Sequence, residues 1–114
     1  MKRELIYVAG PYTAGTPERI ERNVLKAIEI GLQIFKKGHI PFIPHLTHWV
    51  DIFAKEHQIP MAYDDYMNWD EAFWAKCDAL YYISPSKGTD LELARSLDDG
   101  MKIYYSIEEI EQAN

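Results

Sequence analysis

Two carboxylates of this sequence lie where they could act on a small ligand. The first, Glu92, is near the start of an expected helix that follows the loop Ser84–Gly88. A carboxylate there can point into a crevice at the end of the preceding strand. The segment Thr89-Asp90-Leu91-Glu92 also fits a capping box, in which the Glu92 side chain accepts from the Thr89 amide. Residue types and spacing alone favour the capping role.

The second carboxylate, Asp70, lies in the middle of an expected helix, eight residues before Asp78. Its neighbours Asp64 and Glu71 are also acidic, and acidic residues that share a helix face are usually solvated. Spacing alone therefore favours a solvated Asp70 over a catalytic one.

His45 and His48 are three residues apart, a spacing at which two imidazoles can bind one metal ion. No third ligand lies nearby in the sequence. We therefore predict no metal site and expect the two histidines to form hydrogen bonds at the rim of a crevice.

The loop Gly10–Gly15 joins an expected strand, Leu5–Ala9, to a helix that opens at Thr16. Backbone N–H groups and the helix dipole at such a junction favour an anionic or hydroxyl-rich ligand. The loop has neither the glycine spacing of a dinucleotide fingerprint nor the Lys-Ser/Thr ending of a P-loop. The alternative is a tight turn that only needs its glycines; topology favours ligand binding.

Strands and helices alternate along the chain. β-prone apolar runs predict strands at 5–9, 40–44, 78–83 and 102–105, and helical spacing or capping signals predict helices at 16–37, 46–56, 63–76, 89–99 and after Ser106. Apolar residues from Ile20 to Phe35 recur as on one buried helix face. Two prolines place the strand at 40–44 on a sheet edge.

This alternation predicts an α/β fold, a three-layer, doubly wound, mostly parallel sheet of four to five strands. Ligands of such sheets bind beyond the carboxyl ends of the strands, near the point where strand order reverses. Three loops should meet there: Gly10–Gly15, Pro44–His48 and Ser84–Gly88.

Composition limits the class of protein. The 114 residues suit one domain, 1–114, and 12 basic against 18 acidic residues give a net charge of −6, which argues against a duplex nucleic acid partner. Cys77 is the single cysteine, so no intramolecular disulfide forms. The apolar run Leu5–Ala9 is shorter than a signal-peptide core or a membrane span. We expect a cytoplasmic protein without a membrane partner.

Two motifs resemble a known family. Tyr7-Val8-Ala9-Gly10-Pro11-Tyr12 and Gly88-Thr89-Asp90-Leu91-Glu92 are similar to motifs of the nucleoside 2-deoxyribosyltransferase superfamily, which includes the 2'-deoxynucleoside 5'-phosphate N-hydrolases. The likeness extends from Leu5 to about Tyr105 and implies a flavodoxin-like or Rossmann-like sheet. The arginine-bearing first loop of the phosphate hydrolases is replaced here by Pro11–Gly15.

The resemblance implies a role for each candidate residue. Glu92 matches the nucleophile that attacks the anomeric carbon of the sugar, and Asp70 matches the second catalytic carboxylate. Ser86 occupies the position of a phosphate-binding serine, which favours a nucleotide. The full set of substrate-binding candidates is Gly10, Tyr12, His45, Ser86 and Gly88.

The expected function is therefore cleavage or transfer of the N-glycosidic bond of a (deoxy)nucleoside or nucleoside 5'-monophosphate. It requires no metal or other cofactor, because two carboxyl groups supply the nucleophile and the acid. The small size leads us to expect a homodimer or larger homo-oligomer. The alternatives are a non-catalytic nucleotide-binding module on the same fold and a structural protein without a pocket, in which Glu92 caps a helix.

Overall fold

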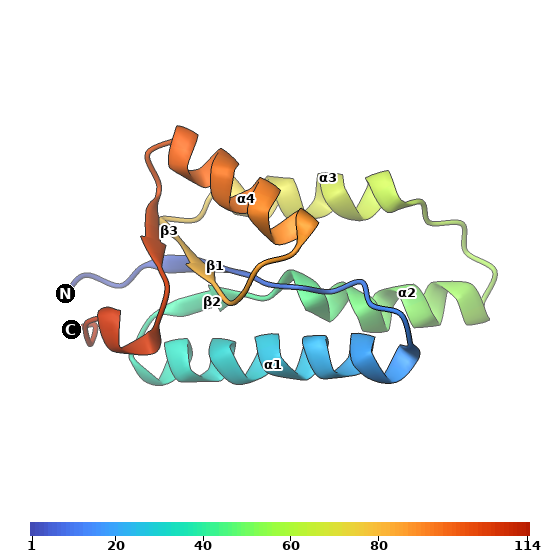
Figure 1. Ribbon diagram of the computed structural model, residues 1–114, viewed down its shortest axis with the longest axis horizontal. Helices are drawn as coiled ribbons and strands as arrows, with labels where there is room; N and C mark the ends of the chain where they lie inside the picture. The colour runs from blue at the N-terminus through green and yellow to red at the C-terminus, as the bar shows by residue number, and fades with distance from the viewer.

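Strands and helices alternate along residues 1–114, all of which the computed structural model describes (Figure 1). The strands are β1 (Leu5–Ala9), β2 (Ile40–Phe42), β3 (Ala79–Tyr82) and β4 (Lys102–Tyr104). The helices are α1 (Pro17–Lys36), α2 (Thr47–Glu56), α3 (Tyr63–Trp74) and α4 (Lys87–Asp98), with short 3₁₀ helices η1 (Pro44–Leu46) and η2 (Ile107–Glu109).

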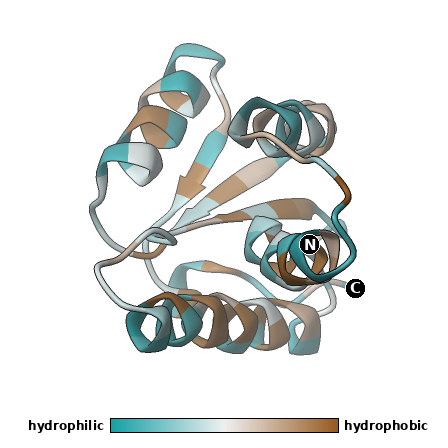
Figure 2. Cartoon of the chain, turned by 90° about the vertical axis from the view of Figure 1, so that its right-hand side faces the viewer, coloured by the Kyte–Doolittle hydropathy of each residue, from teal (hydrophilic) through white to brown (hydrophobic).

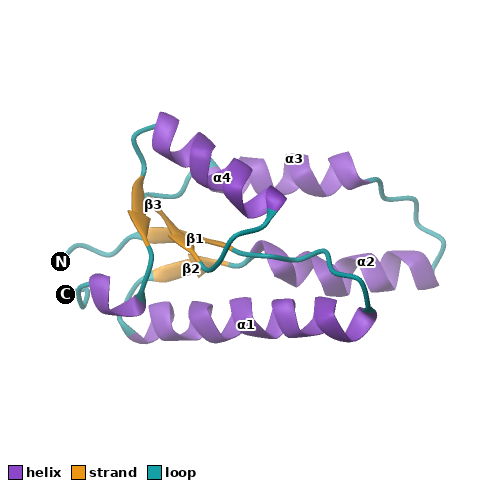
Figure 3. Ribbon diagram, viewed as in Figure 1, coloured by secondary structure: helices purple, strands orange, loops and turns teal.

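The predicted α/β fold is confirmed, with four strands in one parallel sheet of order β2-β1-β3-β4. Helices cover both faces of this sheet and make three layers (Figure 3). β2 lies at an edge of the sheet, as predicted, where a proline such as Pro41 is tolerated because one side of the strand has no ladder partner. Strand order reverses between β1 and β3, because β2 lies on one side of β1 and the later strands lie on the other.

β1 is the centre of the core. Ile6 and Val8 belong to one buried cluster with Ile34 of α1, whereas Tyr7 belongs to a second cluster against which Trp74 of α3 packs. Figure 2 shows the hydrophobic strands lying between the helical layers. Because both faces are covered, β1 is a continuous apolar run rather than an alternating one.

Several element boundaries differ from the sequence prediction, and three of the differences have a clear cause. α4 begins at Lys87, two residues earlier than expected, because the Ser86 hydroxyl accepts from the Thr89 amide and makes Ser86 the N-cap. β2 ends at Phe42, since Pro44 starts η1. The expected C-terminal helix is only the single turn η2.

Phe35 was expected on the buried face of α1, and this is wrong because its side chain is 59% exposed. The buried stripe of α1 contains Val24, Ala27 and Ile34. Phe35 lies about 100° around the helix from Ile34, since α-helices have 3.6 residues per turn. α1 therefore presents a second apolar stripe to solvent.

α2 and α3 extend beyond the ends of the strands, at the right of Figure 1. They make the molecule elongated, with principal extents of 45 × 26 × 23 Å. None of the helices has both the length and the hydropathy to cross a membrane.

Candidate active site

A cleft of about 810 Å³ opens beyond the carboxyl ends of the central strands. α2 and α3 line one side, and the β1–α1 loop and the start of α4 line the rest. All seven residues that the sequence nominates contribute to its lining: Gly10, Tyr12, His45, Asp70, Ser86, Gly88 and Glu92. The structure thus brings together residues that lie up to 82 positions apart in the sequence.

Glu92 is positioned by the core of the sheet. The hydroxyl of Tyr7, a β1 residue that is 1% exposed, donates to Glu92 Oε2 over 2.8 Å. Burial raises the pKa of Glu92 to about 7, and the Tyr7 hydrogen bond opposes that rise. The predicted capping role of Glu92 is wrong, because Ser86 is the N-cap and Glu92 lies in the second turn of α4.

Asp70 comes from α3 and meets Glu92 in a small recess that Tyr7 and Trp74 also line. Its Oδ1 atom is buried without a hydrogen-bond partner. Burial raises the pKa of Asp70 to about 7. Spacing alone favoured a solvated Asp70, and that prediction is therefore wrong.

The two carboxyl groups share a recess, and the charge of Asp70 adds to the rise in the pKa of Glu92. Two pKa values near 7 permit one group to be ionised while the other holds a proton. Such a combination could serve as a nucleophile and a general acid at neutral pH.

His45 is a buried acceptor at the cleft, 4% exposed. Its Nε2 atom lies 3.0 Å from Gly10 O and 3.1 Å from Pro11 O. Both partners are carbonyls, so Nε2 holds the proton and Nδ1 is left with a lone pair. Burial lowers the pKa of His45, which keeps the ring neutral. Nδ1 is buried without a partner within the protein, so a ligand donor could reach it only after neighbouring atoms shift.

The first loop is held by polar contacts at the cleft mouth. Tyr12 OH lies 2.9 Å from His48 Nδ1, and Asn23 Nδ2 donates to Tyr12 O. His48 therefore forms the rim hydrogen bond that the sequence predicts, whereas His45 lies deeper. Gly10 packs closely against the next strand end, because a Cβ there would come within 2.7 Å of Ile83 Cδ1 and the Ile83 side chain would have to shift. No three His, Cys, Asp or Glu side chains are grouped to hold a metal ion.

The start of α4 offers polar groups at the other end of the cleft. Ser86 Oγ accepts from the Thr89 amide and lies 2.6 Å from Thr89 Oγ1. The Ser86 hydroxyl is free to donate to a ligand when Thr89 donates to Ser86. A Cβ built at Gly88 would meet no atom within 4 Å, so the backbone there faces open space.

Several lining residues were missed by sequence reasoning. Thr47, Asp51 and Lys55 of α2 recur every four residues and present one helix face to the cleft. That spacing was visible in the sequence, but which face turns inward depends on tertiary packing. The Tyr66 hydroxyl donates to Asp51 Oδ1. The other oxygen of Asp51, Oδ2, forms an ion pair with Lys55 Nζ at 2.8 Å.

The cations of the cleft differ in their partners. Lys55 is paired with Asp51, and Arg95 is paired with Glu71 at 2.6 Å. Lys87, at the start of α4, forms neither of these ion pairs. A ligand anion would therefore find its most available cation beside Ser86 and Gly88.

A comparison with protein families finds one match, a family model described as a domain of unknown function (DUF7768), which covers residues 4–106. The match includes every residue of the candidate site named above. No curated protein matches the chain.

Proposed function

The chain belongs to the DUF7768 family, and we propose that it cleaves or transfers the N-glycosidic bond of a (deoxy)nucleoside or nucleoside 5'-monophosphate. The observation that carries the proposal is the recess shared by Glu92 and Asp70, whose pKa values are both raised to about 7. Cleaving this bond develops positive charge on the sugar carbon and negative charge on the base. An ionised carboxylate stabilises the first charge and a carboxylic acid neutralises the second.

The first step forms a covalent sugar–enzyme intermediate. Glu92 Oε1 bonds to the anomeric carbon while the bond from that carbon to the base nitrogen breaks. The base leaves with the electron pair and takes a proton from Asp70. Tyr7 holds Oε2 through its hydrogen bond, which orients the carboxylate for attack.

The second step releases the sugar. Water gives hydrolysis, and a second base gives transfer: either one attacks the anomeric carbon and the bond to Glu92 breaks. The attacking group loses its proton to the Asp70 carboxylate, so both carboxyl groups return to their starting states. A nucleophile and an acid that switches to a base are the parts that such double displacements need.

Binding of the substrate is assigned to the two ends of the cleft. Gly10, Tyr12 and His45 would contact the ligand at the first loop, and Ser86 and Gly88 at the start of α4. The helix N-terminus beside Lys87 suits a 5'-phosphate. A ligand donor group would satisfy His45 Nδ1.

The direct experiment is incubation with nucleosides and their 5'-monophosphates, followed by chromatography for free base. Glu92→Gln keeps the shape of the side chain and removes the nucleophile, and Glu29→Gln, an exposed change on α1, is the matched control. We expect base release by the wild type and the control only. Turnover that survives Glu92→Ala rules out the assigned mechanism.

The second candidate is a non-catalytic nucleotide-binding module. The amide and hydroxyl groups at the start of α4 favour it, because they would bind a phosphate without any chemistry. A binding module would be stabilised against heat by nucleotides without releasing base. Glu92→Gln would be stabilised in the same way as the wild type. This result would favour the module over the enzyme.

We also propose a cytoplasmic homodimer or larger homo-oligomer, without a duplex nucleic acid partner. The net charge of −6 supports the last point.

A further inference from the structure

The recess that the two carboxyl groups share contains a single cation. Its charged and titratable groups come from three elements: Tyr7 from β1, Asp70 and Glu71 from α3, and Glu92 and Arg95 from α4. Arg95 is therefore the one positive side chain that lines the recess. The proposed mechanism gives Arg95 no role and needs one carboxyl group ionised while the other holds a proton.

Arg95 is held in place by two side chains of α3. Its Nη2 atom donates to Glu71 Oε1 over 2.6 Å, and its guanidinium carbon lies 4.2 Å from the centre of the Trp74 ring. The ring is held in turn, because its Nε1 atom donates over 2.9 Å to Oγ of Ser96, a residue with no exposed surface. A guanidinium that both pairs with a carboxylate and stacks on an aromatic ring is better ordered than an isolated surface cation.

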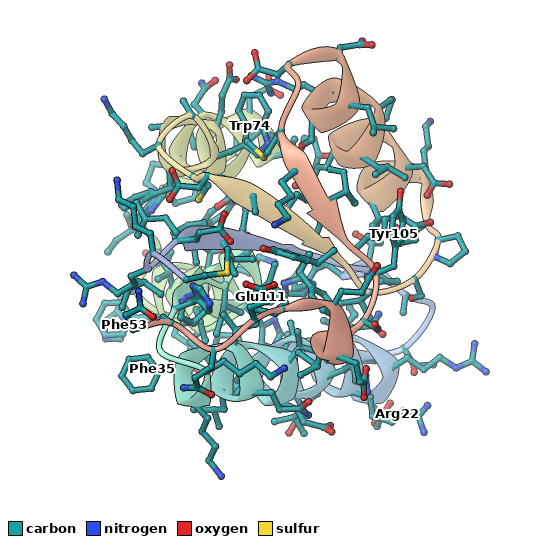
Figure 4. All side chains as sticks on the ribbon, turned by 90° about the vertical axis from the view of Figure 1, so that its left-hand side faces the viewer. Arg22, Phe35, Phe53, Trp74, Tyr105 and Glu111 are labelled. Carbon is teal, nitrogen blue, oxygen red and sulfur yellow. The ribbon has the colours of Figure 1, made fainter.

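These contacts join the two helices that carry the carboxyl groups. Glu71 and Trp74 belong to α3, whereas Arg95 and Ser96 belong to α4. Figure 4 shows Trp74 between the ribbons of α3 and α4. None of the twelve residues of α3 is buried, so contacts with α4 matter more for its position than they would for a core helix. We refer to these four residues as the α3–α4 clamp.

The surroundings of the two carboxyl groups are unequal. Glu92 accepts from the Tyr7 hydroxyl, and Arg95 lies three residues farther along the same helix, where side chains are neighbours. Asp70 Oδ1 is buried and has no donor. Burial raises the pKa of both groups to about 7; the Tyr7 hydrogen bond and the Arg95 charge oppose the rise at Glu92, and no group opposes it at Asp70. The ionised form is therefore better supported at Glu92.

We propose that Arg95, fixed by the α3–α4 clamp, is a positioning residue that keeps Glu92 ionised for attack and leaves the proton of the carboxyl pair on Asp70. This role rests on the proposed function, in which Glu92 is the nucleophile and Asp70 the acid. Arg95 takes part in no bond that forms or breaks. Because the two carboxyl groups are nearly matched, one nearby charge is enough to decide which of them is ionised.

The first test is an NMR titration of the side-chain carboxyl carbons of Asp70 and Glu92 in the full chain without substrate. In the wild type, Glu92 should lose its proton at lower pH than Asp70. Arg95→Met keeps an unbranched side chain and removes the charge, so it should move the titration of Glu92 upward by about half a pH unit, as expected for a partly exposed charge pair. Arg95→Lys restores the charge and should restore the titration.

Lys102→Met is the matched control. Lys102 Nζ also lies over an aromatic ring, 4.9 Å from the centre of Tyr104, but Lys102 lines neither the recess nor the cleft. Its substitution should leave the titration of Glu92 unchanged.

The second readout is the pH profile of base release. Arg95→Met should move the acid limb to higher pH and lower kcat about threefold on that limb, which is the change that half a pH unit gives. KM should change little, and Arg95→Lys should return the limb to its wild-type position. A purely structural role of Arg95 would instead lower kcat by the same factor at every pH.

The wild-type titration keeps the proposal testable if Arg95→Met does not fold, because a Glu92 that loses its proton at higher pH than Asp70 overturns it. An unmoved titration of Glu92 in Arg95→Met overturns it too, as does an equal shift in Lys102→Met. The titrations need no substrate. The expected titrations without base release refute the proposed function and leave the role of Arg95 standing, whereas base release with an unmoved titration of Glu92 does the reverse.

Discussion

The two walls of the cleft are held in place by very different amounts of buried structure. Glu92 hydrogen-bonds to Tyr7 in the middle of the central strand, a residue that is 1% exposed. The opposite wall is α2, with one buried residue. A close-packed core fixes side chains far better than a helix exposed on most sides. The contrast indicates a firmly held Glu92 that faces a more adaptable side of the cleft, formed by α2 and by α3 with Asp70.

Substitution of Glu92, on the firmly held side of the cleft, should have the largest effect on activity. Glu92→Gln removes the proposed nucleophile and should lower base release by roughly 10⁴-fold, as expected for a group that forms the covalent bond. Thermal unfolding should show a fold at least as stable as the wild type, because a buried ionisable group becomes neutral. If the variant retains more than a tenth of the activity, Glu92 is not the nucleophile.

Tyr7→Phe tests whether the core positions the nucleophile. Losing the hydrogen bond to Glu92 should raise the pKa of that carboxyl further, because this bond is what opposes the rise. We expect kcat to fall roughly 10-fold and the acid limb of the pH profile to move to higher pH. An unchanged acid limb would show that Tyr7 only fills space.

His45 gives a smaller effect on binding. His45→Gln keeps a donor at the position of Nε2 for Gly10 O and loses the acceptor Nδ1. The substrate KM should rise about 10-fold with little change in kcat, the value of one lost hydrogen bond. His45→Asn, which retains a polar atom near Nδ1 but cannot reach the carbonyls, is the control and should lower stability instead. Equal KM values for the wild type and His45→Gln would contradict a ligand contact.

The smallest expected effect is on the way in which the stability of the fold depends on pH. Burial raises the pKa of Asp70 from 3.8 to about 7, so the folded state binds more protons than the unfolded state between these values. Stability from this group is therefore present below about pH 4 and is lost as pH rises to about 7. Asp70→Asn should stabilise the protein at pH 8 by roughly 1 kcal/mol, since solvent screens the half-buried carboxyl.

The control for this prediction is Asp64→Asn on the same helix. Asp64 is exposed, so the variant should unfold at the wild-type temperature at both pH 4 and pH 8. Equal stabilisation by Asp70→Asn at both pH values would show that the carboxyl is not destabilised by burial.

The fold could be predicted from the sequence because each strand is an apolar run and each helix has its own periodicity. The residues that the three loops contribute to the cleft followed from topology, since loops after parallel strands meet at one edge. Asp70, on a helix, was indicated only by the family resemblance. The role of Glu92 did not follow: two hydroxyl residues, Ser86 and Thr89, compete for the N-cap, and the choice between them decides whether Glu92 is free. The orientation of α2 also depends on packing, because both of its faces suit a contact.

The most direct measurement is the mass of the protein quenched in acid during turnover of a nucleoside or its 5'-monophosphate. The account predicts an added mass of one sugar, or sugar phosphate, on the peptide that contains Glu92, and none on Glu92→Gln. An adduct on any other residue, or release of base with no adduct at Glu92, would contradict a double displacement through this carboxylate.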